Sequence, residues 1–192
     1  MIRLLIVDDH PAMRAGLTAV LRSEPGIVPL AAAASADELA PTLTRTRPDV
    51  VLLDYHLGGL TDGLRICREL KRTVLAPAVL LYSAYADASL VVPAILAGAD
   101  GILNKSAPAH ELYDAIRAVA RGDRVLPPVP RQLLESASHA VDPVDLPILG
   151  MVLDGTPLTE VAETLRVPTP DVVRRLDAMI ERLRIEVPAP AA

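Results

Sequence analysis

The sequence predicts an α/β domain with a parallel five-stranded sheet, followed by a small all-α domain. The first observation is that residues 1–121 alternate short, uniformly apolar runs with amphipathic stretches. A run that is apolar throughout is typical of a strand buried on both faces, as in a parallel sheet covered by helices. The second is that strand and helix patterns alternate five times, which favours right-handed crossovers with helices on both faces of the sheet.

The elements of the first domain are separated by turns rich in glycine and proline. The apolar runs predict strands at residues 2–7, 27–31, 49–54, 78–83 and 101–104. The stretches between them predict helices at 12–23, 36–46, 62–72, 87–97 and 108–121. Pro93 falls within the fourth helical pattern, so we expect that helix to be short or distorted unless the proline stands near its start.

The chain changes character after residue 121. Residues 122–141 are proline-containing and predict a linker with a short helical piece at 130–137. Residues 142–185 predict a small domain of three helices, at 143–154, 158–165 and 170–184. The tail at 186–192 is too rich in proline and alanine to fold, and we expect it to be disordered.

The composition narrows the class of protein. The chain has 192 residues, of which 51% are hydrophobic, and it lacks Trp and Phe, so its core must be aliphatic. The single Cys67 excludes an internal disulfide and indicates a reducing compartment. No apolar run approaches the roughly 20 residues of a membrane span, and the apolar start is too short for a signal peptide. We therefore expect a soluble, cytoplasmic protein without membrane contact.

Polar residues follow four of the predicted strands, at the edge where parallel sheets bind ligands. These residues are Asp8, Asp9, Asp54, Ser83 and Lys105. An aspartate after a strand often serves only as a helix N-cap, and for any single one of these residues such a purely structural role is as good an explanation as a functional one. That reading fits the whole set poorly, because converging carboxylates repel each other unless a cation compensates.

A hard divalent cation is the natural compensation, because Mg²⁺ binds carboxylates, waters and phosphate oxygens. The residues suit phosphoryl transfer onto a carboxylate. Asp54 would be the nucleophile, the metal and Lys105 would neutralise the phosphoryl oxygens, and Ser83 would donate a hydrogen bond to the product.

Four segments carry a resemblance to a known family: VDDH (7–10), LLDYHLGG (52–59), LYSA (81–84) and NKSAP (104–108). Residues 1–121 resemble the response-regulator receiver domain of two-component signalling. The resemblance implies a flavodoxin-like (βα)5 fold with sheet order 2-1-3-4-5, a sensor histidine kinase as partner, and a homodimer through the receiver as a candidate assembly. It also implies the roles of the site residues: Asp54 as phosphoacceptor, Asp8, Asp9, Asp54 and the His56 backbone carbonyl as Mg²⁺ ligands, Ser83 as switch hydroxyl and Lys105 as phosphate partner.

Two features depart from that family's pattern. Ile102 stands where the family commonly has an aromatic residue that turns inward with the switch hydroxyl, although Tyr82 and Tyr85 flank Ser83. The loop from Asp54 to residues 62–63 is one residue longer than the commonest form. His10, directly after the acid pair, is expected to face solvent rather than bind the metal.

The last two predicted helices have the spacing of a helix-turn-helix. Apolar residues recur at helical spacing in both segments, and Val167 occupies the corner between them. With the receiver in front, this segment resembles the LuxR-type output domain of the NarL/FixJ group. The resemblance implies that residues 170–183 form a recognition helix for the major groove of DNA.

The surface of that segment differs from the family's pattern. Residues 142–192 contain five arginines and nine acidic residues, a net formal charge of −4, whereas DNA affinity rests on phosphate neutralisation. Asp171 and Val173 stand where the family usually has threonine-like and lysine residues, and the family's fourth helix is not evident. The remaining candidate DNA contacts are Arg174, Arg175 and Arg182.

Three functional hypotheses remain open at the level of sequence. The leading one is a response regulator, phosphorylated by a histidine kinase, that regulates transcription by atypical binding to promoter DNA. It is a switch and not a turnover enzyme, since its chemistry is limited to its own phosphorylation and dephosphorylation. The alternative is a phosphorylation-gated protein-interaction module whose degenerate helix-turn-helix no longer binds DNA. The third is a pseudo-receiver responding to a small ligand, which the intact site residues disfavour.

Overall fold

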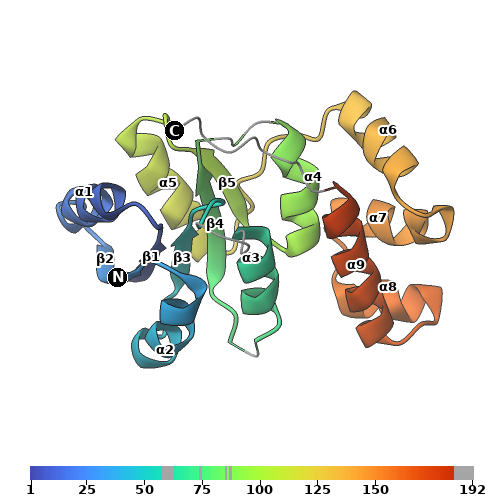
Figure 1. The fold of residues 1–192 in the computed structure, drawn as a ribbon, viewed down its shortest axis with the longest axis horizontal. Coiled ribbons are helices and arrows are strands. Elements are labelled where there is room, and N and C mark those ends of the chain that lie inside the picture. Colours follow the sequence, from blue (N-terminus) through green and yellow to red (C-terminus); the bar gives the residue numbers. More distant parts are fainter. Residues whose placement is uncertain (58–62, 74, 85, 87, 184–192) are drawn as a thin grey trace. The chain divides into compact units, whose positions relative to one another are not determined.

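The computed structural model describes residues 1–57, 63–73, 75–84, 86 and 88–183, and the chain forms two compact units (Figure 1). The first unit comprises Met1–Ala86 and Gly98–Pro127, and the second combines the segment that ends at Ala97 with the chain that begins at Pro128. The predicted loop insertion after Asp54, Tyr85 and the predicted tail at 186–192 lie outside the described residues. None of the helices described is both long and apolar enough to cross a membrane.

The first unit is built on a parallel sheet with strand order β2-β1-β3-β4-β5, which confirms the predicted topology. The strands are β1 (Ile2–Val7), β2 (Ile27–Ala33), β3 (Val50–Leu53), β4 (Ala78–Ser83) and β5 (Gly101–Asn104). All pair in parallel. In β2 the register shifts so that Leu30 is skipped, directly after Pro29, which has no N–H to donate to the sheet.

Four helices flank this sheet: α1 (Pro11–Arg22), α2 (Ala36–Thr46), α3 (Gly63–Lys71) and α5 (Ala109–Ala120). Alternate strand residues, such as Leu4, Ile6 and Tyr82, form one apolar core with α1 and α5. The intervening residues point to the opposite face because side chains alternate along a strand. Because side chains on both faces are covered in β3 and β4, these strands are almost entirely apolar and do not alternate with polar residues.

Local signals set the ends of these helices. Pro11 is the first residue of α1, where its missing N–H is no loss. At the start of α2 the Ser35 side chain accepts from the Glu38 N–H, and Glu38 accepts in return from the Ala34 N–H at 2.8 Å. Arg47 follows the end of α2 as its C-cap, in the left-handed conformation with φ 44°, just before Pro48.

The second unit contains six helical elements among the described residues: α4 (Ala88–Ala97), α6 (Arg131–Ala140), the 3₁₀ turn η1 (Pro143–Asp145), α7 (Leu146–Leu153), α8 (Leu158–Leu165) and α9 (Thr169–Leu183). Helix α4 contains Pro93, carries no charged residue and is buried from Leu90 to Ala97. It packs against α6, α7 and α9. An all-round apolar helix needs such cover on every side.

One predicted helix, at 143–154, is divided in the structure. The 3₁₀ turn η1 comes first, with the Val144 N–H bonded to the Asp142 side chain at 3.0 Å, and α7 then starts at Leu146. Pro147 has no N–H to give to the carbonyl of residue 143, so an α-helix cannot run through this position from 143.

Helices α8 and α9 form the predicted helix-turn-helix geometry. Arg166 follows the end of α8 as its C-cap and adopts the left-handed conformation with φ 54°. The Val167 N–H then donates to the Ala162 carbonyl at 3.0 Å and closes the turn. The buried face of α9 consists of four apolar residues: Val172, Leu176, Met179 and Ile180.

Candidate functional site

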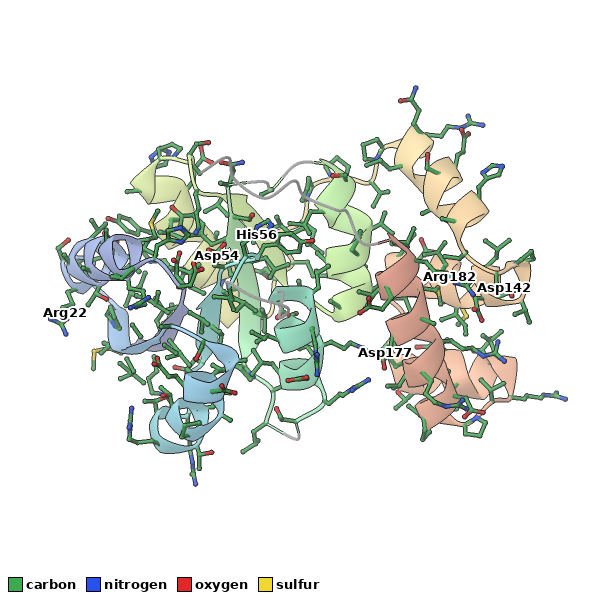
Figure 2. All side chains as sticks on the ribbon, viewed as in Figure 1. Arg22, Asp54, His56, Asp142, Asp177 and Arg182 are labelled. Atoms are coloured by element: carbon green, nitrogen blue, oxygen red, sulfur yellow. The ribbon has the colours of Figure 1, made fainter. Side chains whose placement is uncertain are left out.

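The predicted site residues of the first unit lie at one edge of the sheet. The pairings Val7–Leu53, Leu53–Leu81 and Ser83–Asn104 bring the carboxyl ends of four strands into line. Asp8, Asp54, Ser83 and Lys105 are carried by these strand ends. Figure 2 shows Asp54 and His56 directly beyond β3.

Lys105 joins two buried carboxylates at this edge. Its Nζ lies 2.7 Å from Asp8 Oδ2 and 2.7 Å from Asp54 Oδ2. The exposed fractions of the three side chains are 13%, 2% and 4%. The Lys105 loop is fixed to β4, since the Lys105 N–H donates to the Ser83 carbonyl at 3.0 Å. One ammonium thus faces two carboxylates in a place from which water is largely excluded.

Burial sets the charge state of this group. Desolvation raises the pKa of the Asp54 carboxyl, and the hydrogen bond and charge of Lys105 offset this only in part. Desolvation alone would lower the pKa of Lys105, but hydrogen bonds and charges from Asp54 and Asp8 outweigh it, so its pKa is raised. Lys105 is therefore held as a cation, whereas burial makes the charged form of Asp54 less favourable than it is in water.

Asp9 and His10 complete an acidic cluster that can hold a cation. Ligand atoms from Asp8, Asp9, His10 and Asp54 all lie within 4.8 Å of one another. Asp9 Oδ1 is buried and makes no hydrogen bond among the described residues, although His10 Nδ1 lies 2.6 Å away. A buried carboxylate oxygen without a donor suits a hard divalent cation, so these residues fit Mg²⁺.

The backbone around the acid pair is held by local hydrogen bonds. The His10 N–H donates to Asp8 Oδ1 at 2.8 Å, and Arg14 Nη1 donates to the Asp8 carbonyl at 2.7 Å. The His10 ring is 69% exposed, as expected, yet its nitrogen lies within the cluster. The sequence signal for this was its place directly after two aspartates.

Three further residues singled out in the sequence stand on β4, directly after β3 and on β5. Ser83 is fully buried at the end of β4. The His56 N–H donates to Asp54 Oδ1 at 3.3 Å, and its ring meets Tyr55 edge to face with centroids 4.6 Å apart. The metal-binding role of the His56 carbonyl stays a prediction. Ile102 is buried in β5 opposite Leu81, so an aliphatic side chain fills the position of the family's aromatic.

Sequence reasoning assigned Tyr82 no role beyond flanking Ser83. In the structure the side chain is 6% exposed, and its hydroxyl donates to the backbone carbonyl of Lys105 at 3.3 Å. Burial raises the pKa of this phenol. The contact joins residues 23 apart in the chain, which no local pattern could have indicated.

The three arginines predicted to contact DNA have different surroundings in the second unit. Arg174 forms an ion pair with Asp171 one turn earlier in α9. Arg175 Nη1 donates to Asp145 Oδ1 at 3.1 Å. Arg182 is exposed on the last turn of α9 and has no ion-pair partner within the described part of the chain (Figure 2). Two of the three cations are therefore already paired with carboxylates.

Comparison with known proteins agrees with this geometry. Residues 4–117 match the family model of the response regulator receiver domain. The transcriptional regulatory protein LiaR of Bacillus subtilis is 29% identical over 96% of this chain and 92% of its own length. The response regulator UvrY of Escherichia coli is 27% identical over 96% of this chain and 89% of its own length.

Two solved structures are similar as well. RcsB of Salmonella enterica bound to a promoter has a TM-score of 0.62, covering 97% of this chain and 93% of that one; at 19% identity it shows the likeness of fold. A two-component response regulator of the LuxR family from Aurantimonas is 31% identical, with a TM-score of 0.63, and the match covers 71% of this chain and 97% of that one. With its sheet-edge carboxylates, its lysine and these matches, the chain belongs to the response regulator receiver family and is a two-component response regulator of the LuxR family.

Proposed function

We propose that the chain is phosphorylated on Asp54 by a sensor histidine kinase and regulates transcription through its C-terminal helices. The observation that carries the proposal is the bridge from Lys105 Nζ to Asp54 and Asp8, 2.7 Å from each. A lysine held against a nucleophilic carboxylate at the edge of a parallel sheet is suited to receiving a dianionic phosphoryl group.

The proposed chemistry follows from the donor set. A carboxylate oxygen of Asp54 attacks phosphorus, the new P–O bond forms, and the P–N bond to the kinase imidazole breaks with the imidazole as leaving group. Lys105 moves from the free carboxylate to a phosphoryl oxygen, and the Ser83 hydroxyl donates to another. Mg²⁺, when bound, neutralises the oxygens of the reacting group; its proposed ligands are Asp8, Asp9, Asp54 and the His56 carbonyl.

Hydrolysis of the acyl phosphate returns Asp54 to its starting state, so the chain is a switch and not a turnover enzyme. A phosphoryl group adds about two negative charges beside the cluster. That charge attracts the ammonium of Lys105, which donates hydrogen bonds to Asp8 and Asp54 before phosphorylation. Repartnering of one lysine is therefore the first local event that we propose for the switch.

The proposed output is control of transcription at promoter DNA, with the sensor kinase and a second copy of the receiver as protein partners inside the cytoplasm. Relatives named as transcriptional regulators match across 96% of this chain, including the helix-turn-helix. This favours transcription over the alternative of a protein-interaction module. Among the arginines of α9, the unpaired Arg182 and the exposed Arg174 are the proposed phosphate contacts.

Incubation with acetyl phosphate and Mg²⁺ tests the phosphorylation. The wild type should gain one phosphoryl group, resolved by intact-protein mass spectrometry, and Asp54→Asn should gain none. Asp49→Asn is the matched control, because Asp49 pairs with Arg3 away from the cluster and should leave labelling unchanged. Equal labelling of wild type and Asp54→Asn would disprove the assignment of the phosphoacceptor.

A mobility-shift screen on the upstream region of its own gene, with phosphorylated protein, then tests DNA binding.

A further inference from the structure

Tyr82 connects the apolar core of the first unit with the loop that carries Lys105. Its ring belongs to the core that β1, β3 and β4 form with α1 and α5, a core that also contains Leu112 and Ile116. Its hydroxyl reaches out of that core to the Lys105 carbonyl, 3.3 Å away. Ser83, the next residue, points to the opposite face of the sheet, because side chains alternate along a strand.

The Lys105 loop is held from both sides of its backbone. The Lys105 N–H donates to the Ser83 carbonyl at 3.0 Å, and the Lys105 carbonyl accepts from Tyr82. Both partners come from the last two residues of β4. With its peptide groups fixed in this way, the four-carbon side chain of Lys105 has a defined starting point, and its Nζ reaches Asp54 and Asp8 at 2.7 Å.

We infer that Tyr82 is a positioning residue for phosphoryl transfer: its hydroxyl holds the Lys105 backbone so that the ammonium stays against Asp54 and the incoming phosphoryl group. The inference rests on the proposed function, because it concerns the lysine of the proposed acceptor site. It also supplies a physical link between that site and the α5 side of the sheet. In this chain Ile102 offers no hydroxyl or ring for such a link, whereas Tyr82 offers both.

The Tyr82→Phe variant tests the inference, because it removes the hydroxyl and keeps the ring in the core. Tyr113→Phe is the matched control: Tyr113 packs partly buried against the same core, and its hydroxyl makes no hydrogen bond within the described part of the chain. Lys105 offers a selective signal, since the chain has two lysines and only Lys105 precedes a serine. Protein labelled with carbonyl-¹³C lysine and ¹⁵N serine therefore gives one correlated peak, which reports the Lys105 carbonyl.

We expect Tyr82→Phe to shift this carbonyl resonance upfield, because a hydrogen bond to the oxygen deshields the carbon. Phosphorylation by acetyl phosphate should slow by about two- to tenfold, which is the change in rate that corresponds to the free energy of one hydrogen bond. Tyr113→Phe should change neither quantity. In a Lys105→Ala background, Tyr82→Phe should slow the reaction no further, whereas a loss of general stability would slow it there too.

Three outcomes would overturn the inference: an unmoved carbonyl resonance, an unchanged phosphorylation rate despite a moved resonance, or an equal additional effect in the Lys105→Ala background. Failure of the proposed function is distinguishable from these. In that case the wild type itself takes no phosphoryl group from acetyl phosphate, while the carbonyl resonance still reports whether Tyr82 holds the Lys105 loop.

Discussion

Arg175 on α9 donates a hydrogen bond from Nη1 to Asp145 Oδ1, at 3.1 Å, and thereby ties α9 to the η1 turn. Asp145 is buried, with 11% of its side chain exposed. Removal of the arginine would leave a buried carboxylate unpaired, so Arg175→Ala should lower the free energy of unfolding by about 1–3 kcal/mol. Urea unfolding followed by circular dichroism measures this.

Arg174→Ala is the matched control for that experiment. Arg174 is on the same helix, one residue earlier, but its side chain is 74% exposed and its partner Asp171 is a third exposed. A surface pair of this kind contributes little to stability. An equal loss of stability in both variants would refute the structural role assigned to Arg175.

DNA binding should depend on Arg174 and Arg182 in a way that salt reveals. Each substitution by alanine should weaken binding to a promoter fragment and reduce the salt slope by about 1 if the side chain contacts a phosphate. Asp171→Asn should strengthen binding, because it releases Arg174 from its ion pair. Fluorescence anisotropy at several salt concentrations gives both quantities.

Arg22 provides the control for the charge itself. It is exposed at the end of α1, in the first unit, and Arg22→Ala changes the net charge by the same amount. It should leave DNA affinity and salt slope unchanged. A similar loss of affinity in Arg22→Ala, Arg174→Ala and Arg182→Ala would mean that net charge rather than α9 governs binding.

The sheet was predictable because its signals are local. Each strand is mostly apolar rather than alternating, each is followed by a helical pattern, and a parallel sheet covered by helices is the sheet type that buries both faces in this way. The five polar residues of the site could also be found, because a parallel sheet places the carboxyl ends of all its strands at one edge. Periodicity and the rule for where parallel sheets bind ligands therefore predicted the strands and the site edge, whereas the strand order came from the resemblance to receiver domains.

The remaining features depend on pairings that the sequence does not encode locally. Arg175 meets a carboxylate 30 residues away, and Tyr82 meets a carbonyl 23 residues away. Their residue types gave no indication of these partners. The division of the helix at 143–154 was visible in principle, because Pro147 stands one turn after Pro143, but apolar residues continue on both sides of Asp145 and through both elements.

Asp54 should make the protein less stable as pH rises above about 4. The pKa of its carboxyl is raised above the ordinary value of 3.8. The folded state therefore holds a proton that the unfolded state has released, and stability falls through the window between 3.8 and the folded value. Asp54→Asn, which resembles the protonated form, should be more stable than the wild type at neutral pH, with the difference shrinking toward pH 3.8.

Asp49 is the control with the opposite sign. Its pKa is lowered by the hydrogen bond from Arg3, so its contribution to stability is present above 3.8 and is lost as pH falls through the folded value. Asp49→Asn should therefore be less stable than the wild type at neutral pH and similar in acid. Melting curves between pH 3 and 8 compare the two variants. If Asp54→Asn were less stable than the wild type at pH 7, this would contradict the expectation that the buried Asp54 carboxylate destabilises the fold.

Mg²⁺ should stabilise the folded chain through Asp9. Asp9 Oδ1, which makes no hydrogen bond among the described residues and lies beside the His10 ring, would become a ligand of the cation. Ligand binding to the folded state alone adds RT ln(1 + [L]/Kd) to stability. At a Mg²⁺ concentration of ten times the Kd, the gain in the free energy of unfolding is about 1.4 kcal/mol, which corresponds to a rise in Tm of about 3–5 °C for a protein of this size. Differential scanning fluorimetry with MgCl₂, at constant ionic strength, measures the shift. Asp9→Asn should lose most of it, whereas Asp49→Asn should retain it, and an undiminished shift in Asp9→Asn would place the cation elsewhere.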